Sequence, residues 1–244
     1  MGQALARGLG ETGDFRITAL VDVTAPQDLF DATYATSLDE LDASTLDVVI
    51  DFSTPEGVAH SARWCAAHAV ALVIGATGLN EQQRACVDDA AARVGVVMAS
   101  NFSIGAVLAE RFAALAAPFF EGVEIVELHH DRKVDAPSGT SVATARSIES
   151  ARSTAGMDSI TDPTERLTID GARGADAGGG VRIHSVRLPG LVAHQEILFG
   201  GPGEGLSIRH DTFDRSSFVQ GVALAANAVD ATPRFFDGIA SLVN

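Results

Sequence analysis

Residues 46–78, LDVVIDFSTPEGVAHSARWCAAHAVALVIGATG, hold one complete β–α–β unit. The two apolar runs, Leu46–Phe52 and Ala71–Gly75, are nearly continuous, which is typical of parallel strands covered by helices on both faces. Between them, Thr54 is followed by a proline and a glutamate, a pattern that predicts the start of a helix over Pro55–Ala69. The stretch therefore predicts two parallel strands joined by a crossover helix.

The same alternation extends in both directions from this unit. It predicts further strands at Arg16–Asp22 and Gly95–Ala99 and a helix at Glu81–Val94. A doubly wound domain normally opens with a strand and a glycine-rich turn, whereas this sequence begins with MGQALARGL, which has a helical pattern. We therefore expect residues 1–102 to form a Rossmann-like doubly wound parallel sheet with its first strand missing.

The regular alternation of predicted strands and helices ends at residue 102. Strand-like runs follow one another too closely for crossover helices, so a second α/β domain with a mixed or antiparallel sheet is expected over residues 103–214. Residues 215–244 are expected to add helices to the first domain. The predicted helices are Gly105–Phe120, Ser138–Ala155, Ser216–Ala231 and Phe235–Val243, the strands are Val123–His130, Val181–Arg187, Val192–Phe199 and Leu206–Asp211, and Asp170–Gly180 is predicted to be a mobile loop.

The amino-acid composition argues against several classes of function. The 17 basic residues against 32 acidic ones give a net charge of −15, so nucleic acid and anionic membrane surfaces are not expected partners. No apolar run approaches the roughly 20 residues that span a bilayer, and no secretory signal opens the chain. Two cysteines, Cys65 and Cys86, are too few for a disulfide framework and are expected to be buried thiols. A cytoplasmic location is expected.

Small residues at the ends of the predicted strands suggest a dinucleotide site. Gly2 and Asp22 have the spacing of the last glycine and the ribose-binding carboxylate of a Rossmann unit, although an ordinary helix start and strand end fit them equally. The loops Gly75–Gly78 and Ala99–Phe102 follow two neighbouring strands, where such ligands bind. The candidate cofactor-binding residues are Gly2, Asp22, Gly75, Ala76, Thr77, Ala99, Ser100, Asn101 and Phe102.

One segment carries the candidate chemistry. Lys133 is the only lysine of the chain, which suggests that an amine is required there, although an incidental surface lysine is the alternative. His129 is four residues away and can act as a general acid. His129 and His130 are adjacent on a strand and point to opposite faces, so no metal site is predicted. The PSGT run that ends at Thr140 predicts a helix entry whose free amides suit a carboxylate.

The segment ELHHDRKVDAPSGT, residues 127–140, resembles the signature of the 4-hydroxy-tetrahydrodipicolinate reductase family, also called dihydrodipicolinate reductase. The resemblance extends over nearly the whole chain. It includes VVIDFSTPEG, VIGATG, SNFSIG, GARGAD, GLVAHQEILFG and LSIRHD. It implies an amino-terminal domain that binds NADH or NADPH, a second domain that binds a small dicarboxylate, and a homotetramer formed through its sheet.

The implied reaction removes water from 4-hydroxy-tetrahydrodipicolinate and reduces the resulting imine to tetrahydrodipicolinate, a step of diaminopimelate and lysine synthesis. The resemblance makes His129 the proton donor and Lys133 a second acid and substrate-binding cation. It makes His130, Gly139 and Thr140 ligands of the substrate carboxylates. Relatives that favour NADPH often have an arginine after the acidic residue, and Val23 stands there, so NADH is the expected cofactor.

Two other functions were weighed. A semialdehyde or homoserine dehydrogenase on a similar frame lacks support, because neither cysteine lies in a loop with a histidine partner. A non-catalytic oligomeric protein that has lost the cofactor turn is the second alternative. The presence of His129, Lys133 and the PSGT helix entry argues against it.

Overall fold

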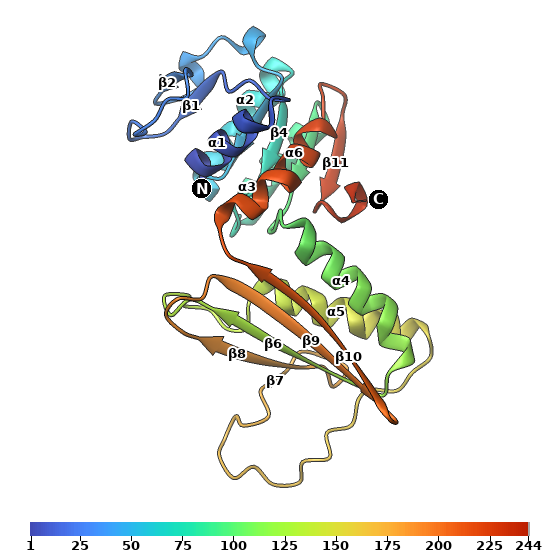
Figure 1. The fold of residues 1–244 in the computed structure, drawn as a ribbon. Helices are drawn as coiled ribbons and strands as arrows, with labels where there is room; N and C mark the ends of the chain where they lie inside the picture. The colour runs from blue at the N-terminus through green and yellow to red at the C-terminus, as the bar shows by residue number, and fades with distance from the viewer. Residues whose placement is uncertain (244) are drawn as a thin grey trace. The chain divides into compact units, whose positions relative to one another are not determined.

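The computed structural model describes residues 1–243, and these divide into two compact units (Figure 1). Unit 1 comprises residues 1–104 and 215–243, and unit 2 comprises Gly105–Asp214. The chain thus passes from one unit to the other twice. No helix among these residues is long and apolar enough to cross a membrane.

A four-stranded parallel sheet forms the centre of unit 1, with the strand order β11-β5-β4-β3. Its strands are β3 (Val48–Asp51), β4 (Ala71–Ile74), β5 (Gly95–Met98) and β11 (Arg234–Asp237). Helices α2 (Pro55–His68) and α3 (Glu81–Ala91) pack on one face and enclose a core with Leu72, Ile74 and Val96. Val73, which points to the other face, is also fully buried, and α6 (Val219–Asn227) packs against β4. The prediction of a sheet covered on both faces is confirmed.

Side-chain caps fix where the crossover helices begin. The hydroxyl of Thr54 accepts a hydrogen bond from the Gly57 amide at 3.2 Å, and a proline follows Thr54 at the first helical position. Asn80 and Gln83 form a reciprocal capping box at the start of α3. Both predicted helices are therefore present and begin at the predicted residues.

The amino-terminal part of unit 1 forms a separate layer. Helix α1 (Gly2–Thr12) packs against α6 and the 3-10 turn η4 (Arg215–Phe218), as Figure 1 shows. Strands β1 (Ala19–Val21) and β2 (Thr33–Ala35) form their own two-stranded parallel sheet, and no described strand pairs with the second edge of β1 or of β3. The 3-10 turns η1 (Leu38–Glu40) and η2 (Ala43–Thr45) lead into β3.

The carboxyl-terminal prediction needs a correction. The helix predicted over Phe235–Val243 is wrong, because that segment contains most of β11, which pairs in parallel with β5, and then the single 3-10 turn η5 (Ala240–Leu242). Phe235 packs against the core of the sheet, so tertiary packing of the aromatic pair decides the local structure. The other predicted helix, Ser216–Ala231, is present as η4 followed by α6.

Unit 2 is a five-stranded mixed sheet with the strand order β10-β9-β6-β8-β7. Strand β6 is parallel to β8 and antiparallel to β9, which confirms the predicted mixed sheet. One face of the sheet packs against helices α4 (Ile104–Ala116) and α5 (Gly139–Thr154) and the turn η3 (Ala117–Phe119), and these elements form a hydrophobic core with the strands. The strands are β6 (Gly122–His129), β7 (Ala175–Asp176), β8 (Arg182–Arg187), β9 (Ala193–Gly201) and β10 (Glu204–Thr212).

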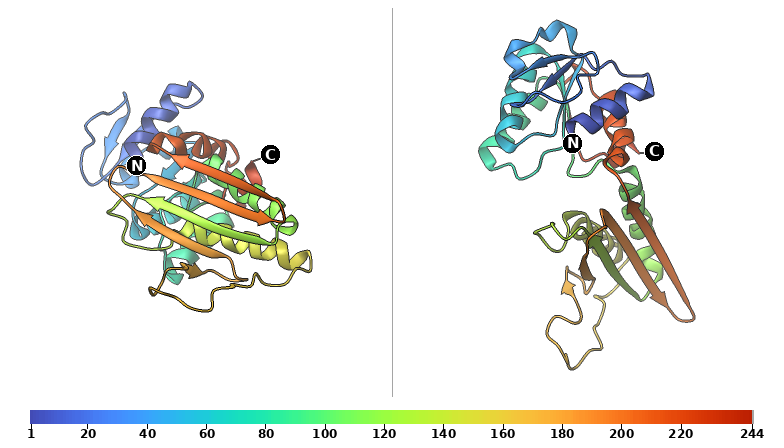
Figure 2. Two further views of the ribbon diagram at one scale, coloured as in Figure 1. Left: turned by 60° about the horizontal axis from the view of Figure 1, so that its bottom comes forward. Right: turned by 60° about the vertical axis from the view of Figure 1, so that its left-hand side comes forward.

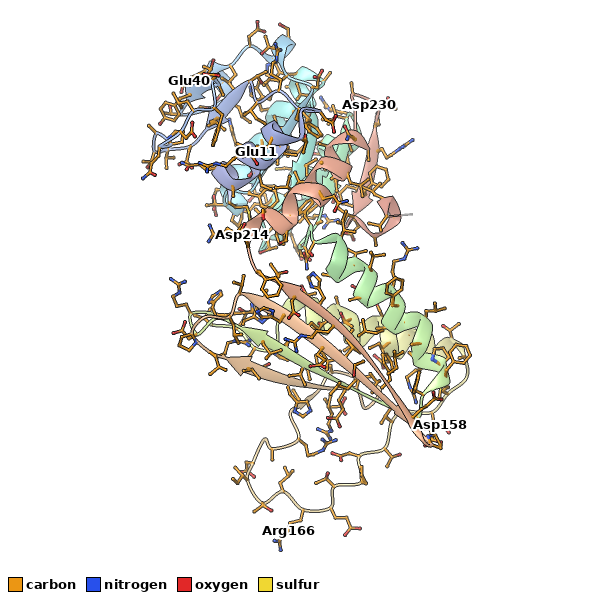
Figure 3. All side chains as sticks on the ribbon, viewed as in Figure 1. Glu11, Glu40, Asp158, Arg166, Asp214 and Asp230 are labelled. Atoms are coloured by element: carbon orange, nitrogen blue, oxygen red, sulfur yellow. The ribbon has the colours of Figure 1, made fainter. Side chains whose placement is uncertain are left out.

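No helix formed by residues 1–243 covers the opposite face of this sheet (Figure 2, left). Charged side chains line part of this face. One of them is Glu124, which forms an ion pair with Arg173 and accepts a hydrogen bond from Nε2 of His184 at 2.7 Å. A long loop follows α5, and side chains such as that of Arg166 project from it into solvent (Figure 3). The short strand β7 interrupts the segment predicted as a loop over Asp170–Gly180 and pairs with β8.

Candidate active site

A row of polar residues interrupts the apolar inner face of the unit 2 sheet. Along β6, Val123 and Ile125 point into the core, and the same alternation places Glu127 and His129 on that face. The residues registered beside Glu127 are Ser185 of β8 and Gln195 of β9. The core is therefore hydrophobic at the start of β6 and polar at its end, where His129 lies.

Glu127 is the centre of this polar row, and sequence reasoning did not select it. The side chain is fully buried, and its carboxylate lies 2.5 Å from Nδ1 of His129. Arg187 donates from Nη1 and Nη2 to the two carboxylate oxygens, each at 2.8 Å. The amide of Ser138 donates to Oε1 at 3.2 Å. One carboxylate thus links β6, β8 and the start of α5.

The charges around His129 act on its pKa in both directions. Burial lowers the pKa of His129 below 6.5 and outweighs the hydrogen bond and charge of Glu127, which raise it. Lys133 and Arg187 add to the lowering through their positive charges. Burial alone would raise the pKa of Glu127, but hydrogen bonds from Arg187, Ser185 and His129 hold that pKa below its usual value. Glu127 is therefore a carboxylate at neutral pH.

His130 and Lys133 lie just beyond the end of β6. Nδ1 of His130 is buried and has no hydrogen-bond partner among the described residues, so a polar atom is left unsatisfied at the end of β6. The amide of Lys133 donates to the carbonyl of His130 at 3.2 Å and closes a turn. Nζ of Lys133 donates to both carboxylate oxygens of Asp135.

The first turn of α5 completes this group of residues. Ser138 is the N-cap, and its hydroxyl accepts a hydrogen bond from the Ser141 amide at 3.2 Å, as the PSGT run predicts. Gly139 and Thr140 are the first residues of the helix, where backbone amides and the helix dipole favour an anion. No atom lies within 4 Å of the position that a Cβ on Gly139 would take, so a ligand can approach the backbone there.

The structure brings two of the predicted cofactor loops together in unit 1. The Ala99 amide donates to the carbonyl of Ile74 at 3.0 Å, which places the loop after β5 beside the turn after β4. The ring of Phe102, the last residue of the second loop, lies 5.3 Å from the ring of Phe52. A Cβ on Gly75 would lie 2.1 Å from the Phe52 ring, so glycine is required for this close packing.

The candidate cofactor residues differ in exposure. Thr77 and Ser100 are exposed and Asn101 is half-buried, whereas Ala76 and Ala99 are buried and Phe102 belongs to the core. Asp22 is exposed at the end of β1, where its carboxylate accepts a hydrogen bond from the Thr24 amide at 3.0 Å. Gly2 is the exposed first residue of α1. No hydrogen bond or strand pairing among residues 1–243 joins Gly2 or Asp22 to the other two loops.

The cysteines do not form a nucleophilic site. Cys65 is buried, as expected, and burial raises the pKa of its thiol to about 12, so the reactive thiolate is absent at neutral pH. Cys86 is half-buried rather than buried, and Nη1 of Arg63 lies 3.0 Å from its sulfur. A thioester-forming dehydrogenase is therefore not supported.

A large hollow in unit 1 is lined by none of the predicted site residues. It is an open depression with a volume of about 990 Å³ between α1, the segment that enters β1 and the loop that follows β1. Its lining comes from Ala6, Arg7, Gly10, Glu11, Phe15, Arg16, Ile17, Thr18, Asp28, Phe30, Asp31 and Thr45. The size of this hollow therefore does not identify the candidate catalytic residues.

Two family models match the chain along most of its length. The model described as dihydrodipicolinate reductase, N-terminus, matches residues 1–102. The model described as dihydrodipicolinate reductase, C-terminus, matches residues 105–242. The division between the two matches falls within three residues of the division between units 1 and 2.

Relatives with the same description are similar over most of their own length. The 4-hydroxy-tetrahydrodipicolinate reductase of Corynebacterium diphtheriae is 43% identical over 94% of this chain and 88% of the relative. The protein of that name from Cutibacterium acnes is 44% identical over 100% of this chain and 94% of the relative. A solved structure, dipicolinate-bound dihydrodipicolinate reductase from Paenisporosarcina sp. TG-14, has a TM-score of 0.84 and 37% identity, and the match covers 98% of this chain and 94% of that one.

Proposed function

The chain belongs to the dihydrodipicolinate reductase family, and from this premise we propose that it reduces 4-hydroxy-tetrahydrodipicolinate to tetrahydrodipicolinate, with loss of water, in diaminopimelate and lysine biosynthesis. The observation that carries the proposal is the assembly of His129, Lys133 and the α5 amino terminus at one end of the unit 2 sheet. These residues supply an acid, a cation and an anion site within one segment.

The substrate is proposed to bind through its carboxylates. Lys133 provides a charged partner, and the backbone at Gly139 and Thr140 provides hydrogen-bond donors at the positive end of α5. His130, whose buried Nδ1 has no partner among the described residues, is proposed as a further ligand of a carboxylate. The solved relative bound to dipicolinate, a small planar dicarboxylate, supports this class of ligand.

His129 is proposed to deliver the proton that completes the reduction, with Lys133 as a second acid. The lowered pKa of His129 makes its protonated form a stronger acid than ordinary imidazolium. A nicotinamide cofactor, when bound, supplies the hydride. The loops that contain Thr77 and Ser100 fit such a cofactor, because they lie side by side at the carboxyl ends of two neighbouring parallel strands.

NADH is the proposed preferred cofactor. Asp22 stands at the position that binds ribose hydroxyls, and Val23 follows it with its side chain 90% exposed. No lysine or arginine occurs between Asp22 and Ser37 to bind a 2′-phosphate. The ratio of kcat/KM for NADH to that for NADPH tests this preference, and a ratio below one contradicts it.

Unit 1 is proposed to bind the cofactor, unit 2 to bind substrate, and the helix-free face of the unit 2 sheet to form a homotetramer. We further propose a cytoplasmic enzyme, on the basis of the acidic composition and the two free cysteines. Sedimentation of the purified chain tests the assembly, and a monomer at micromolar concentration contradicts it.

The reaction is tested by following NADH oxidation with substrate made in situ from pyruvate and aspartate semialdehyde by the preceding synthase. We expect turnover by the wild-type chain and a loss of about 100-fold or more in kcat for His129→Ala. His60→Ala is the control, because His60 lies on α2 of unit 1 and is not one of the predicted site residues. A folded wild-type chain that oxidises neither NADH nor NADPH contradicts the proposed function.

A further inference from the structure

We propose that Glu127 is a positioning residue for the reaction proposed above: it holds the His129 imidazole with the proton on Nδ1, so that His129 gains and loses its catalytic proton at Nε2. The proposal depends on the geometry of one buried carboxylate and its three partners. The proposal rests on the proposed function only in assuming that the proton of His129 is used in the reduction described above.

The first step of the argument is that Glu127 is ionised. Arg187 faces the carboxylate with both terminal nitrogens, which is the paired geometry that stabilises a carboxylate most strongly. The Ser138 amide donates to the same group. An ionised carboxylate can only accept hydrogen bonds, so the short contact with His129 requires a proton on Nδ1.

The second step concerns the free nitrogen of the ring. Because Nδ1 of His129 carries a proton and donates it to Glu127, Nε2 of the neutral ring is unprotonated. The second proton of the cationic form must therefore bind to Nε2. The acid therefore carries its transferable proton on the nitrogen that lies across the ring from Glu127. Without this contact the ring could adopt either tautomer, and part of the population would hold its proton on the wrong atom.

The third step is that stability alone does not explain a buried ion pair at this position. Burying a carboxylate and a guanidinium costs several kcal/mol of desolvation in general, and apolar residues of equal volume often serve a core as well. Arg187 also donates to the carbonyl of Asp135 at 2.8 Å, which fixes the segment that carries Lys133. The pair therefore sets the positions of His129, of the Lys133 segment and of the α5 start together.

Histidine NMR of the ligand-free protein tests the proposal without any assay of turnover. We expect neutral His129 in the wild type to be the Nδ1–H tautomer. In Glu127→Gln the donors of Arg187 will take the amide oxygen and turn the amide nitrogen toward His129, so the ring should change to the Nε2–H tautomer. An Nε2–H wild-type ring, or a tautomer unchanged in Glu127→Gln, overturns the proposal.

Glu124→Gln is the matched control. Glu124 lies on the same strand and also contacts one histidine and one arginine, His184 and Arg173, but on the opposite face. Its substitution should leave the His129 tautomer unchanged. If Glu127→Gln does not fold, Glu127→Asp decides, because its carboxylate keeps the charge beside Arg187 but is one methylene too short to hold Nδ1. Its His129 ring should then lose the fixed Nδ1–H form, and a retained one overturns the proposal.

Kinetics provide the second readout. For Glu127→Gln we expect kcat to fall about 10- to 100-fold, KM to change less than about threefold, and the His129 limb of the pH profile to move to lower pH, because a negative charge that raises the pKa of the ring is lost. The charged groups that face His129 are Glu127, Lys133 and Arg187. A fall in kcat with an unmoved limb and tautomer indicates a merely structural role and overturns the proposal. A wild-type chain without turnover contradicts the reductase function instead.

Discussion

Nζ of Lys133 lies 2.8 Å from each carboxylate oxygen of Asp135, two residues further along the chain. The side chain of Lys133 is 20% exposed and that of Asp135 is 61% exposed, so the pair lies at the surface of unit 2. Lys133 is also the proposed partner of a substrate carboxylate. The side chain of Asp135 therefore forms an ion pair with the cation that we propose for the substrate, and a bound substrate carboxylate would compete with Asp135 for it.

Asp135→Asn should therefore lower KM for the dicarboxylate substrate about two- to fivefold, since an exposed ion pair is weak and its loss frees the ammonium. The melting temperature should change little for the same reason. Asp131→Asn, an exposed acidic residue of the same segment, is the control for net charge. An unchanged or higher KM in Asp135→Asn would show that Asp135 orients Lys133 rather than competing for it.

Lys133→Arg should not preserve activity although it preserves the charge. A guanidinium is planar and remains protonated far above neutral pH, so it cannot serve as a second acid and presents its donors differently. We expect kcat/KM to fall about tenfold or more, with the greater part of the loss in kcat. Arg132→Lys, at the exposed neighbouring position, is the control. Full activity in Lys133→Arg would mean that the site needs only a positive charge.

Acid should destabilise the fold in two stages. The pKa of His129 is lowered in the folded state, mainly by burial, so the folded state resists protonation and stability begins to fall below pH 6.5. The pKa of Glu127 is also lowered, despite its burial, because Arg187, Ser185 and His129 donate to it. Its contribution is present above 4.5 and is lost as pH falls through its folded pKa.

Urea unfolding of the wild type and Glu127→Gln measures this contribution. At pH 7 the substitution should reduce the free energy of unfolding by about 3–5 kcal/mol, because it leaves Arg187 half-buried without its charged partner. The difference should begin to shrink as the pH falls below 4.5 and should go on shrinking as Glu127 is protonated in the folded state. A difference that does not depend on pH would mean that the ionisation of Glu127 contributes nothing to stability.

The sequence predicts His129 and Lys133 because their types and spacing are unusual, whereas Glu127 looked like an ordinary acidic residue. A signal existed, since strand alternation puts Glu127 on the same face as Val123 and Ile125, where a carboxylate needs a partner. The identity of that partner could not be predicted. Arg187 is 60 residues away and reaches Glu127 only through the parallel pairing of β6 with β8.

The same contrast separates the parts of the fold that could be predicted from those that could not. The crossover helices follow from local signals, such as the cap at Thr54, and occur where expected. The segment Phe235–Asp237 is a strand because it pairs with β5, a long-range contact that a short aromatic run does not specify. Proline before this segment and Gly238 after it were the available signs of a separate element.

Gly75→Ala should weaken unit 1 and the proposed cofactor site together. A Cβ at this position would lie 2.1–2.5 Å from the Phe52 ring, so the ring or the turn after β4 must shift. Overpacking of this kind reduces stability by about 1–3 kcal/mol, and KM for NADH should rise. Gly122→Ala is the control, because nothing lies within 4 Å of the corresponding Cβ. If Gly75→Ala is less stable but keeps the wild-type KM for NADH, the turn after β4 does not contribute to cofactor binding.

Val23→Arg should shift cofactor preference toward NADPH. The Val23 side chain is 90% exposed, so an arginine can replace it without repacking, and it would stand beside the carboxylate proposed to bind the ribose. A guanidinium binds phosphate through paired hydrogen bonds, and we expect the ratio of kcat/KM for NADPH to that for NADH to rise about tenfold. Val23→Gln, which is long and polar but uncharged, should leave the ratio nearly unchanged. The Kd of NADPH, measured by fluorescence titration, should fall in Val23→Arg alone. If Val23→Arg changes neither the ratio nor this Kd, Asp22 and the loop that follows it do not contact the adenosine ribose.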